Sequence, residues 1–244
     1  VRQNIKEGAD WIKVMDSHRS QHSEFTLEEL VAISDEAHRL QKKCCIHAGN
    51  VESIEFGIKA GFDSLEHAAF LTEELAEMAI EKNIAWVPTV YVYQNAAEYM
   101  TKVYKNPTPK ELEDIRFLEE TIEGYNDNLL RNYKMGVLIA TGTDICFPEM
   151  FITPIHDEIE SLCRFGLSNL QAIECATGNG AKLLGMEDHF GYIREGLYAD
   201  LIVVEGDPSK DIKALRNVCE VYKEGELLYG SEYGTCKKGD LIYA

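Results

Sequence analysis

Short apolar segments typical of strands alternate with amphipathic helical segments along the first 90 residues. Each pair of strand-like segments is separated by one helix and short turns, which is the crossover that joins parallel neighbours in a sheet. The alternation therefore predicts an α/β fold built on a parallel sheet. The strand-like segments are residues 11–15, 44–47, 64–67 and 84–90, and the helical segments are 26–40, 50–60 and 72–82.

Local start signals place several helices. Thr26 and Glu29 form a capping box at the start of the first helical segment. The strongest signal, Thr108 followed by Pro109, lies inside a long helical insertion predicted at residues 95–134. This insertion interrupts the regular alternation.

The second half of the chain changes character. An apolar run predicts a fifth strand at residues 137–142, followed by helices at 154–165 and 169–177. Short strands between glycine turns then predict a β-rich tail at 201–204, 218–221 and 226–229. We therefore predict two domains, residues 1–186 and 187–244.

Five strands are too few for a closed parallel barrel, which needs about eight. A barrel prediction thus requires three more strands upstream of Val1. The chain contains no GxGxxG or GxxxxGK[ST] motif, which argues against a nucleotide-binding doubly wound sheet. A doubly wound sheet without such a motif remains the competing architecture.

The charge and cysteine content of the chain limit the classes of binding partner and the cellular compartment that we expect. The chain has 24 basic and 42 acidic residues, a net charge of -18, spread along its length. Nucleic acid and anionic membranes are therefore not expected as partners. Seven cysteines, an odd number without a CxxC pair, favour a reducing compartment, and we expect a cytoplasmic protein.

Four residues with metal-binding chemistry lie at or near predicted strand ends: Lys13, His47, His67 and Asp144. The carboxyl ends of parallel strands meet at one edge, so His47 and His67 are expected to lie close together. Asp144 follows an apolar strand, where a buried carboxylate needs a cation or hydrogen bonds. If Lys13 faces a barrel interior, burial would depress the pKa of its amine and permit a carbamate.

Each residue also has a structural alternative. His47 can hydrogen-bond a loop carbonyl, Asp144 can cap the next turn, and Lys13 can be an ordinary edge-strand lysine. These alternatives stay open from the residues alone.

The same residues stand in motifs that resemble a known family. They are similar to strands four to eight of the (β/α)8 TIM barrel of the amidohydrolase superfamily, in its imidazolonepropionase-like and prolidase-like dipeptidase branch. Residues 191–204 resemble that branch's return into a small β-sandwich. The motifs are GADWIKV (residues 8–14), IHA (46–48), LEH (65–67), VPT (87–89) and GTD (142–144).

The resemblance implies roles for the four residues. Lys13 would be a carboxylated bridging lysine, His47 and His67 ligands of one ion, and Asp144 both ligand and catalytic acid/base. The implied cofactor is one or two divalent ions, zinc by family expectation, although manganese, iron or cobalt also suit the ligands. The family's His-x-His pair on its first barrel strand is absent from this sequence.

The implied activity is hydrolysis, by metal-activated water, of an amide in a dipeptide or N-acyl amino acid of the Xaa-Pro type. Candidate substrate contacts are Tyr91, Tyr93, His18 and His22. The expected binding partner is a small amide or dipeptide substrate, and the chain could also form a homo-oligomer. Two alternatives remain open: a single-ion imidazolonepropionase-like cyclic amide hydrolase or deaminase, and a catalytically incomplete scaffold fragment.

Overall fold

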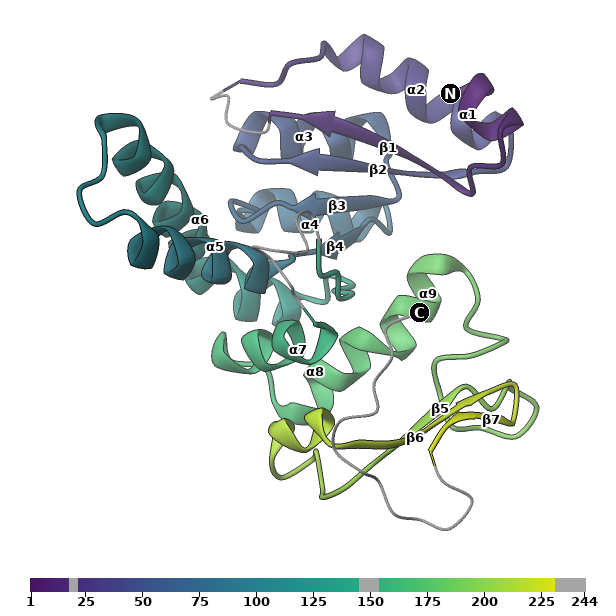
Figure 1. Ribbon diagram of the computed structural model, residues 1–244. Helices are drawn as coiled ribbons and strands as arrows, with labels where there is room; N and C mark the ends of the chain where they lie inside the picture. The colour runs from purple at the N-terminus through teal and green to yellow at the C-terminus, as the bar shows by residue number, and fades with distance from the viewer. Residues whose placement is uncertain (18–21, 145–153, 231–244) are drawn as a thin grey trace. The chain divides into compact units, whose positions relative to one another are not determined.

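The computed structural model describes residues 1–17, 22–144 and 154–230, which form two compact units (Figure 1). The first unit is Val1–Leu167 and the second is Ser168–Ala244. The domain boundary predicted after residue 186 stays a prediction. Among the described helices, none combines the length and apolar character needed to cross a membrane.

The first unit is built on a four-stranded parallel sheet in the order β1-β2-β3-β4. Successive strands are neighbours, as the short helical crossovers predict, so all four carboxyl ends lie at one edge. The register sets Lys13 opposite Cys45 and Cys45 opposite Ser64. The strands are β1 (Trp11–Asp16), β2 (Lys43–Ala48), β3 (Ser64–His67) and β4 (Ala85–Val87).

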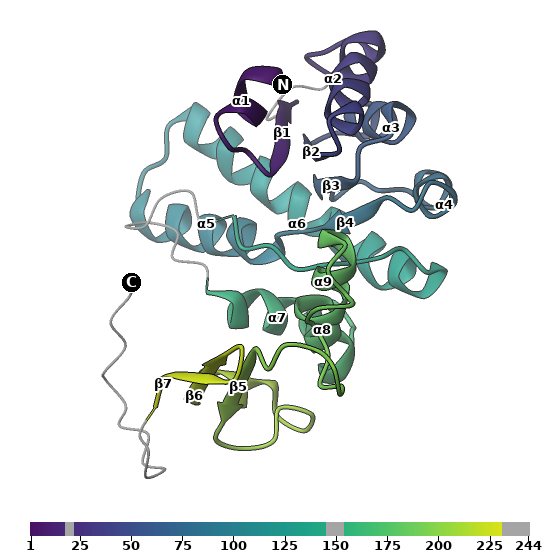
Figure 2. The same ribbon diagram turned by 90° about the vertical axis from the view of Figure 1, so that its right-hand side faces the viewer.

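Three crossover helices, α2, α3 and α4, lie along one face of this sheet (Figure 2). Gly57 of α3 allows close packing, since a Cβ there would lie 2.9 Å from Cγ2 of Ile46 and 3.0 Å from Cδ2 of Leu65. The helices near the sheet are α1 (Arg2–Lys6), α2 (Leu27–Arg39), α3 (Val51–Ala60) and α4 (Glu73–Glu81).

The side chains of β1 alternate between the two faces. Ile12 and Val14 are buried beneath the crossover helices, whereas Lys13 and Met15 are exposed. This period of two places Lys13 and Met15 on the face of β1 that points away from the crossover helices.

The predicted capping boxes are confirmed. The Thr26 hydroxyl accepts the backbone N–H of Glu29, whose carboxylate accepts the Thr26 N–H in return. Thr108 and Glu111 form the same arrangement, with Pro109 in the first turn. Such pairs satisfy two of the donors that every helix start leaves unbonded.

Two strand predictions need correction. The fourth strand ends at Val87 rather than residue 90, and the fifth strand predicted at 137–142 is only an isolated parallel bridge between Trp86 and Ile139. Two backbone bonds join the segments, from Trp86 N–H to Leu138 and from Ala140 N–H to Trp86. The ladder stops there because Pro88 has no N–H to donate.

The predicted helical insertion is two helices, α5 (Val90–Val103) and α6 (Pro109–Met135). It begins at residue 90 rather than 95. The buried side chains of Asn128 and Asn132 donate to the carbonyls of Ala69 at 2.6 Å and Leu71 at 2.8 Å. These bonds tie α6 to the turn that follows β3, so the insertion is part of the first unit's core. Helix α7 (Ile155–Arg164) then completes the unit.

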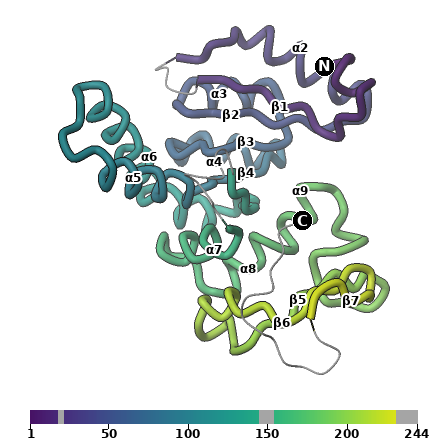
Figure 3. The backbone as a smooth tube through the Cα atoms, viewed as in Figure 1, coloured from purple at the N-terminus to yellow at the C-terminus, as the bar shows by residue number. Residues whose placement is uncertain are grey.

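The second unit contains a three-stranded antiparallel sheet in the order β5-β6-β7, which confirms the predicted β-rich tail. Helix α9 was not predicted as a separate helix. Figure 3 traces the backbone through both units. The elements are α8 (Asn169–Ala176), α9 (Gly178–Leu184), β5 (Leu201–Val204), η1 (Ile212–Arg216), β6 (Val218–Lys223) and β7 (Glu226–Tyr229).

Candidate metal centre

His47 and His67 lie together at the carboxyl ends of β2 and β3. Their ring centroids are 4.3 Å apart and their planes are tilted by 59°. Each residue is only 4% exposed. The register sets His47 opposite Glu66, so His67 stands one residue further along. The predicted proximity of the two imidazoles is therefore confirmed.

Three side chains hold His67 in place. Its Nδ1 lies 2.7 Å from the hydroxyl oxygen of Thr89. The Trp86 indole N–H donates to the His67 carbonyl at 2.7 Å, and the Tyr93 ring packs edge-on with 5.7 Å between centroids. With Nδ1 engaged by Thr89, Nε2 is the ring nitrogen that a metal ion would use.

Lys13 lies on β1, on the sheet face that also carries Cys45. Burial, and then the charge of Glu66, raise the pKa of the Cys45 thiol to about 11, while the positive charge of Lys13 opposes them. Burial also raises the pKa of Glu66, again against Lys13. Lys13 is exposed, yet its charge acts on the carboxylate beside His67.

Asp144 ends the segment that bridges to β4, and it is exposed with a left-handed φ of 45°. Its charge adds to the burial that raises the pKa of Glu66 and that of Tyr125. Asp144 therefore lies within electrostatic range of the carboxyl end of β3. The structure thus brings two of the predicted ligands, His47 and His67, into contact, whereas Lys13 and Asp144 are both exposed.

The predicted substrate contacts lie in different surroundings: one is buried beside His67, one is at a helix start and one is on the surface. Tyr93 is buried and packs on His67. Tyr91 is in the first turn of α5 and donates its backbone N–H to Glu158 at 2.7 Å. His22 is on the surface, with Nδ1 3.5 Å from the Glu52 carboxylate and 82% of its side chain exposed. His18 lies outside the described residues.

Sequence reasoning assigned no role to three residues that support this region: Thr89, which stands in the VPT motif, Tyr125 and Glu158. Thr89 had a local signal, because the preceding Pro88 ends the strand ladder and leaves Thr89 at the strand end. The Tyr125 hydroxyl donates to the Pro88 carbonyl at 2.5 Å from the distant α6. Glu158 is fully buried in α7 and has no local signal of its position.

The donor set fits a divalent metal ion. Two buried imidazoles in contact provide two of the nitrogen ligands that catalytic zinc sites use. The bond from Thr89 to Nδ1 of His67 is the kind of outer partner that orients a metal-binding histidine.

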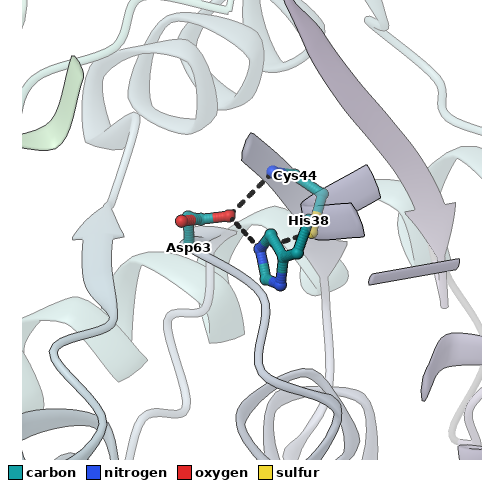
Figure 4. Close-up of side chains that lie close together, drawn as sticks. All are labelled: His38, Cys44 and Asp63. Carbon is teal, nitrogen blue, oxygen red and sulfur yellow. Dashed lines mark hydrogen bonds and ion pairs between the residues drawn. The ribbon is translucent and has the colours of Figure 1, made fainter. Parts of the chain in front are cut away.

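A second polar cluster lies at the opposite, amino-terminal edge of the same sheet (Figure 4). One Asp63 oxygen lies 2.8 Å from Nε2 of His38 and accepts the Cys44 backbone N–H at 2.8 Å. The Cys44 sulfur lies 3.8 Å from the same histidine nitrogen. These residues come from the last turn of α2, the start of β2 and the turn before β3.

This second cluster is explained by hydrogen bonds within the chain. Burial, and then the charge of Asp63, raise the pKa of the Cys44 thiol to about 12, so the sulfur stays protonated near neutral pH. A thiol binds metals as the thiolate, which makes it a poor ligand here. We therefore interpret His38, Cys44 and Asp63 as a tether between a helix and two strands.

Comparison with known proteins matches the whole arrangement to one family. The model described as "Amidohydrolase family" matches residues 1–228. A Xaa-Pro dipeptidase, whose crystal structure has methionine bound in the active site, is 34% identical with a TM-score of 0.84. The superposition covers 94% of this chain and 57% of the dipeptidase.

The ochratoxinase of Aspergillus niger is also similar. It is 30% identical over 254 residues, which cover 96% of this chain and 49% of the ochratoxinase. Its crystal structure superposes with a TM-score of 0.79. The chain thus spans about half the length of the curated relatives that it matches.

Proposed function

The chain belongs to the amidohydrolase family, and from that premise we propose that its gene product hydrolyses amide bonds with a divalent metal ion, zinc first. The observation that carries the proposal is the buried pair His47 and His67. Their rings lie 4.3 Å apart at neighbouring carboxyl ends of a parallel sheet, where enzymes built on parallel strands place their chemistry.

Four residues would hold the metal. His47 and His67 supply imidazole nitrogens, and Asp144 supplies a carboxylate at the end of the segment bridged to β4. Lys13, on the exposed face of β1, would be a further metal ligand as a carbamate. When bound, the metal supplies Lewis-acid polarisation of the scissile carbonyl and lowers the pKa of a coordinated water to about 7.

The chain's own residues would move the proton and shape the site. The exposed Asp144 carboxylate accepts the proton of the attacking water and returns it to the leaving nitrogen. Tyr93 packs against His67 and excludes water from one side of the imidazole. Thr89 keeps His67 in the tautomer that presents Nε2.

The proposed substrates are dipeptides or N-acyl amino acids of the Xaa-Pro type. The similarity to a Xaa-Pro dipeptidase with bound methionine supports an amino acid product, and the ochratoxinase supports hydrolysis within the same family. We also propose that the β1–β4 sheet is part of a (β/α)8 barrel, and that β5–β7 are part of a small β-sandwich, as the structural matches over half of the relatives' length support.

The test uses the full-length gene product and three variants, His47→Ala, His67→Ala and Asp144→Ala. Bound metal is measured by mass spectrometry, and hydrolysis is measured on a panel of Xaa-Pro dipeptides. We expect loss of bound metal in both histidine variants. We also expect at least about a 100-fold loss of kcat/KM in Asp144→Ala, because proton transfer is removed.

His189→Ala is the matched control, because His189 is exposed and stacks on Tyr198 in the second unit. Its metal content and activity should equal those of the wild type. Unchanged metal content and unchanged hydrolysis in all three site variants would overturn the proposal.

A further inference from the structure

We propose that Glu158 of α7 is a positioning residue for the metal centre, acting through the start of α5 and Thr89 on the imidazole of His67. The inference rests on the proposed function, since it takes His67 as a metal ligand. It assigns a role to a buried carboxylate that the hydrolytic chemistry itself does not use.

Glu158 caps a helix to which it does not belong. One carboxylate oxygen accepts the backbone N–H of Val90 at 2.9 Å, and the other accepts that of Tyr91 at 2.7 Å. These are the first two N–H groups of α5, which the helix itself cannot satisfy. Glu158 is fully buried, so water cannot replace it. The carboxylate thereby fixes the backbone that directly follows Thr89.

Thr89 explains why α5 needs an outside cap. It is the N-cap residue, but its side chain makes no bond to the helix start. Its hydroxyl instead lies 2.7 Å from Nδ1 of His67. The usual capping group has therefore been diverted to the histidine, and Glu158 performs the capping in its place.

The backbone of Thr89 is strained in a way that requires such support. It adopts the left-handed conformation, with φ 51° and ψ 46°, which is rare for a β-branched residue. Strain of this kind persists only where the surroundings hold it. Tyr125 holds the segment on one side through the Pro88 carbonyl, and Glu158 holds it on the other.

The two carboxyl oxygens of Glu158 suit this role, because each accepts one N–H of the helix start. A carboxylate at a helix N-terminus interacts favourably with the helix dipole. Burial raises the pKa of Glu158 to about 7, although the two backbone bonds oppose the rise. The charge of Glu158 in turn adds to the burial and to the effect of Tyr93 that raise the pKa of Tyr125. Asp157 and Glu160 flank Glu158 on α7 itself.

A purely structural role is the alternative, and the chain offers a matched control for it. Ser161, one turn further along α7, is fully buried and donates its hydroxyl to Gln94 of α5 at 2.7 Å. This bond joins the same two helices but does not touch the start of α5. Ser161→Ala should therefore loosen the helix pair without disturbing His67.

The experiment measures metal binding in the full-length gene product and in Glu158→Gln, Thr89→Val, Thr89→Ser and Ser161→Ala. Zinc affinity is determined by competition with a chelator, and the visible absorption of the cobalt-substituted protein reports ligand geometry. We expect Glu158→Gln and Thr89→Val each to weaken zinc binding about 10- to 100-fold and to change the cobalt spectrum. The double variant should lose less than the product of the two effects, because both act on one path.

Thr89→Ser keeps the hydroxyl and should bind zinc as the wild type does. Ser161→Ala should unfold at a lower temperature yet keep wild-type zinc affinity. Wild-type affinity and an unchanged spectrum in both Glu158→Gln and Thr89→Val would overturn the inference. If Glu158→Gln does not fold, Glu158→Asp replaces it, since the shorter side chain keeps the charge but cannot reach both N–H groups, and wild-type zinc affinity in that variant would overturn the inference.

His67→Ala separates this inference from the proposed function. If that variant keeps its zinc, the assignment of His67 as a ligand is wrong and the proposed function fails with it. If it loses zinc while Glu158→Gln and Thr89→Val keep theirs, only the positioning role fails.

Discussion

The two edges of the β1–β4 sheet differ in where residues with left-handed backbone lie. At the carboxyl edge, left-handed backbone occurs at Ser17, His67, Ala68, Thr89 and Asp144, none of them glycine. At the amino edge it occurs at Gln41, Gly61 and Asn83, each just past a helix, where left-handed residues close helices without difficulty.

The polar side chains at the two edges differ in where their hydrogen-bond partners come from. In the tether of His38, Cys44 and Asp63, the polar groups form hydrogen bonds with one another, and the raised pKa of the Cys44 thiol keeps the sulfur neutral. The His47 and His67 pair instead relies on outside residues, Thr89 and behind it Glu158, to orient it. Strain and outside support concentrate where a ligand is expected, whereas local satisfaction marks the edge that maintains stability.

The largest expected effect that distinguishes the edges is stabilisation by metal. Zinc at 1,000 times its dissociation constant should raise the free energy of unfolding by about 4 kcal/mol in the wild type. His67→Ala should abolish that rise. Asp63→Asn should lower stability with and without zinc, because a backbone N–H loses its charged partner, but should keep the zinc-dependent rise.

Thermal unfolding of the full-length gene product, with zinc and with a chelator, provides this measurement. Asn at position 63 can still accept one hydrogen bond, which makes folding of that variant feasible. If Asp63→Asn and His67→Ala lost the zinc-dependent rise equally, the contrast between the two edges would be wrong.

A smaller effect concerns pH and the outside support at the carboxyl edge. The pKa of Glu158 rises from 4.5 to about 7 on folding, because of burial. Between these values the folded chain holds a proton that the unfolded chain has lost. The bound proton therefore contributes its full share to the free energy of unfolding below pH 4.5, and this contribution is lost as pH rises through 7. The loss relative to Glu158→Gln is on the order of 3 kcal/mol.

Urea unfolding of both proteins at a series of pH values, in chelator, isolates this effect from metal binding. The difference in unfolding free energy between wild type and Glu158→Gln should shift against the wild type as pH rises. A difference that stayed constant from pH 4.5 to 8 would show that burial does not alter Glu158 as described.

The smallest effect tests the sheet between the edges. Gly57→Ala would place a methyl group 2.9 Å from Cγ2 of Ile46 and 3.0 Å from Cδ2 of Leu65. Overpacking outweighs the better helix propensity of alanine, so we expect a net loss of about 1 kcal/mol. Zinc affinity should stay at the wild-type value, whereas a lower affinity would mean that α3 packing also positions His47.

Sequence reasoning succeeded where the cause is local. The capping boxes at Thr26 and Thr108 marked helix starts, because each signal lies within a few residues. The proximity of His47 and His67 followed from strand order alone.

The features that the sequence did not predict depend on contacts between residues far apart in the chain. Residues 137–142 have the composition of a strand, but the neighbouring β4 is cut short by Pro88, so only a bridge forms. Glu158 lies 68 residues from the Val90 N–H that it accepts, and nothing beside it in the sequence indicates that contact. Long-range capping of this kind becomes visible only in the folded chain.

The bond from the Trp86 indole to the His67 carbonyl would make the proposed metal centre observable by fluorescence. The chain contains two tryptophans, Trp11 and Trp86, and Trp86 is fully buried. A Trp11→Phe protein would emit from this indole alone within the chain, at a site whose hydrogen-bond acceptor belongs to a proposed ligand. Any displacement of His67, by metal, substrate or mutation, would then register as a change in the emission of one identified residue.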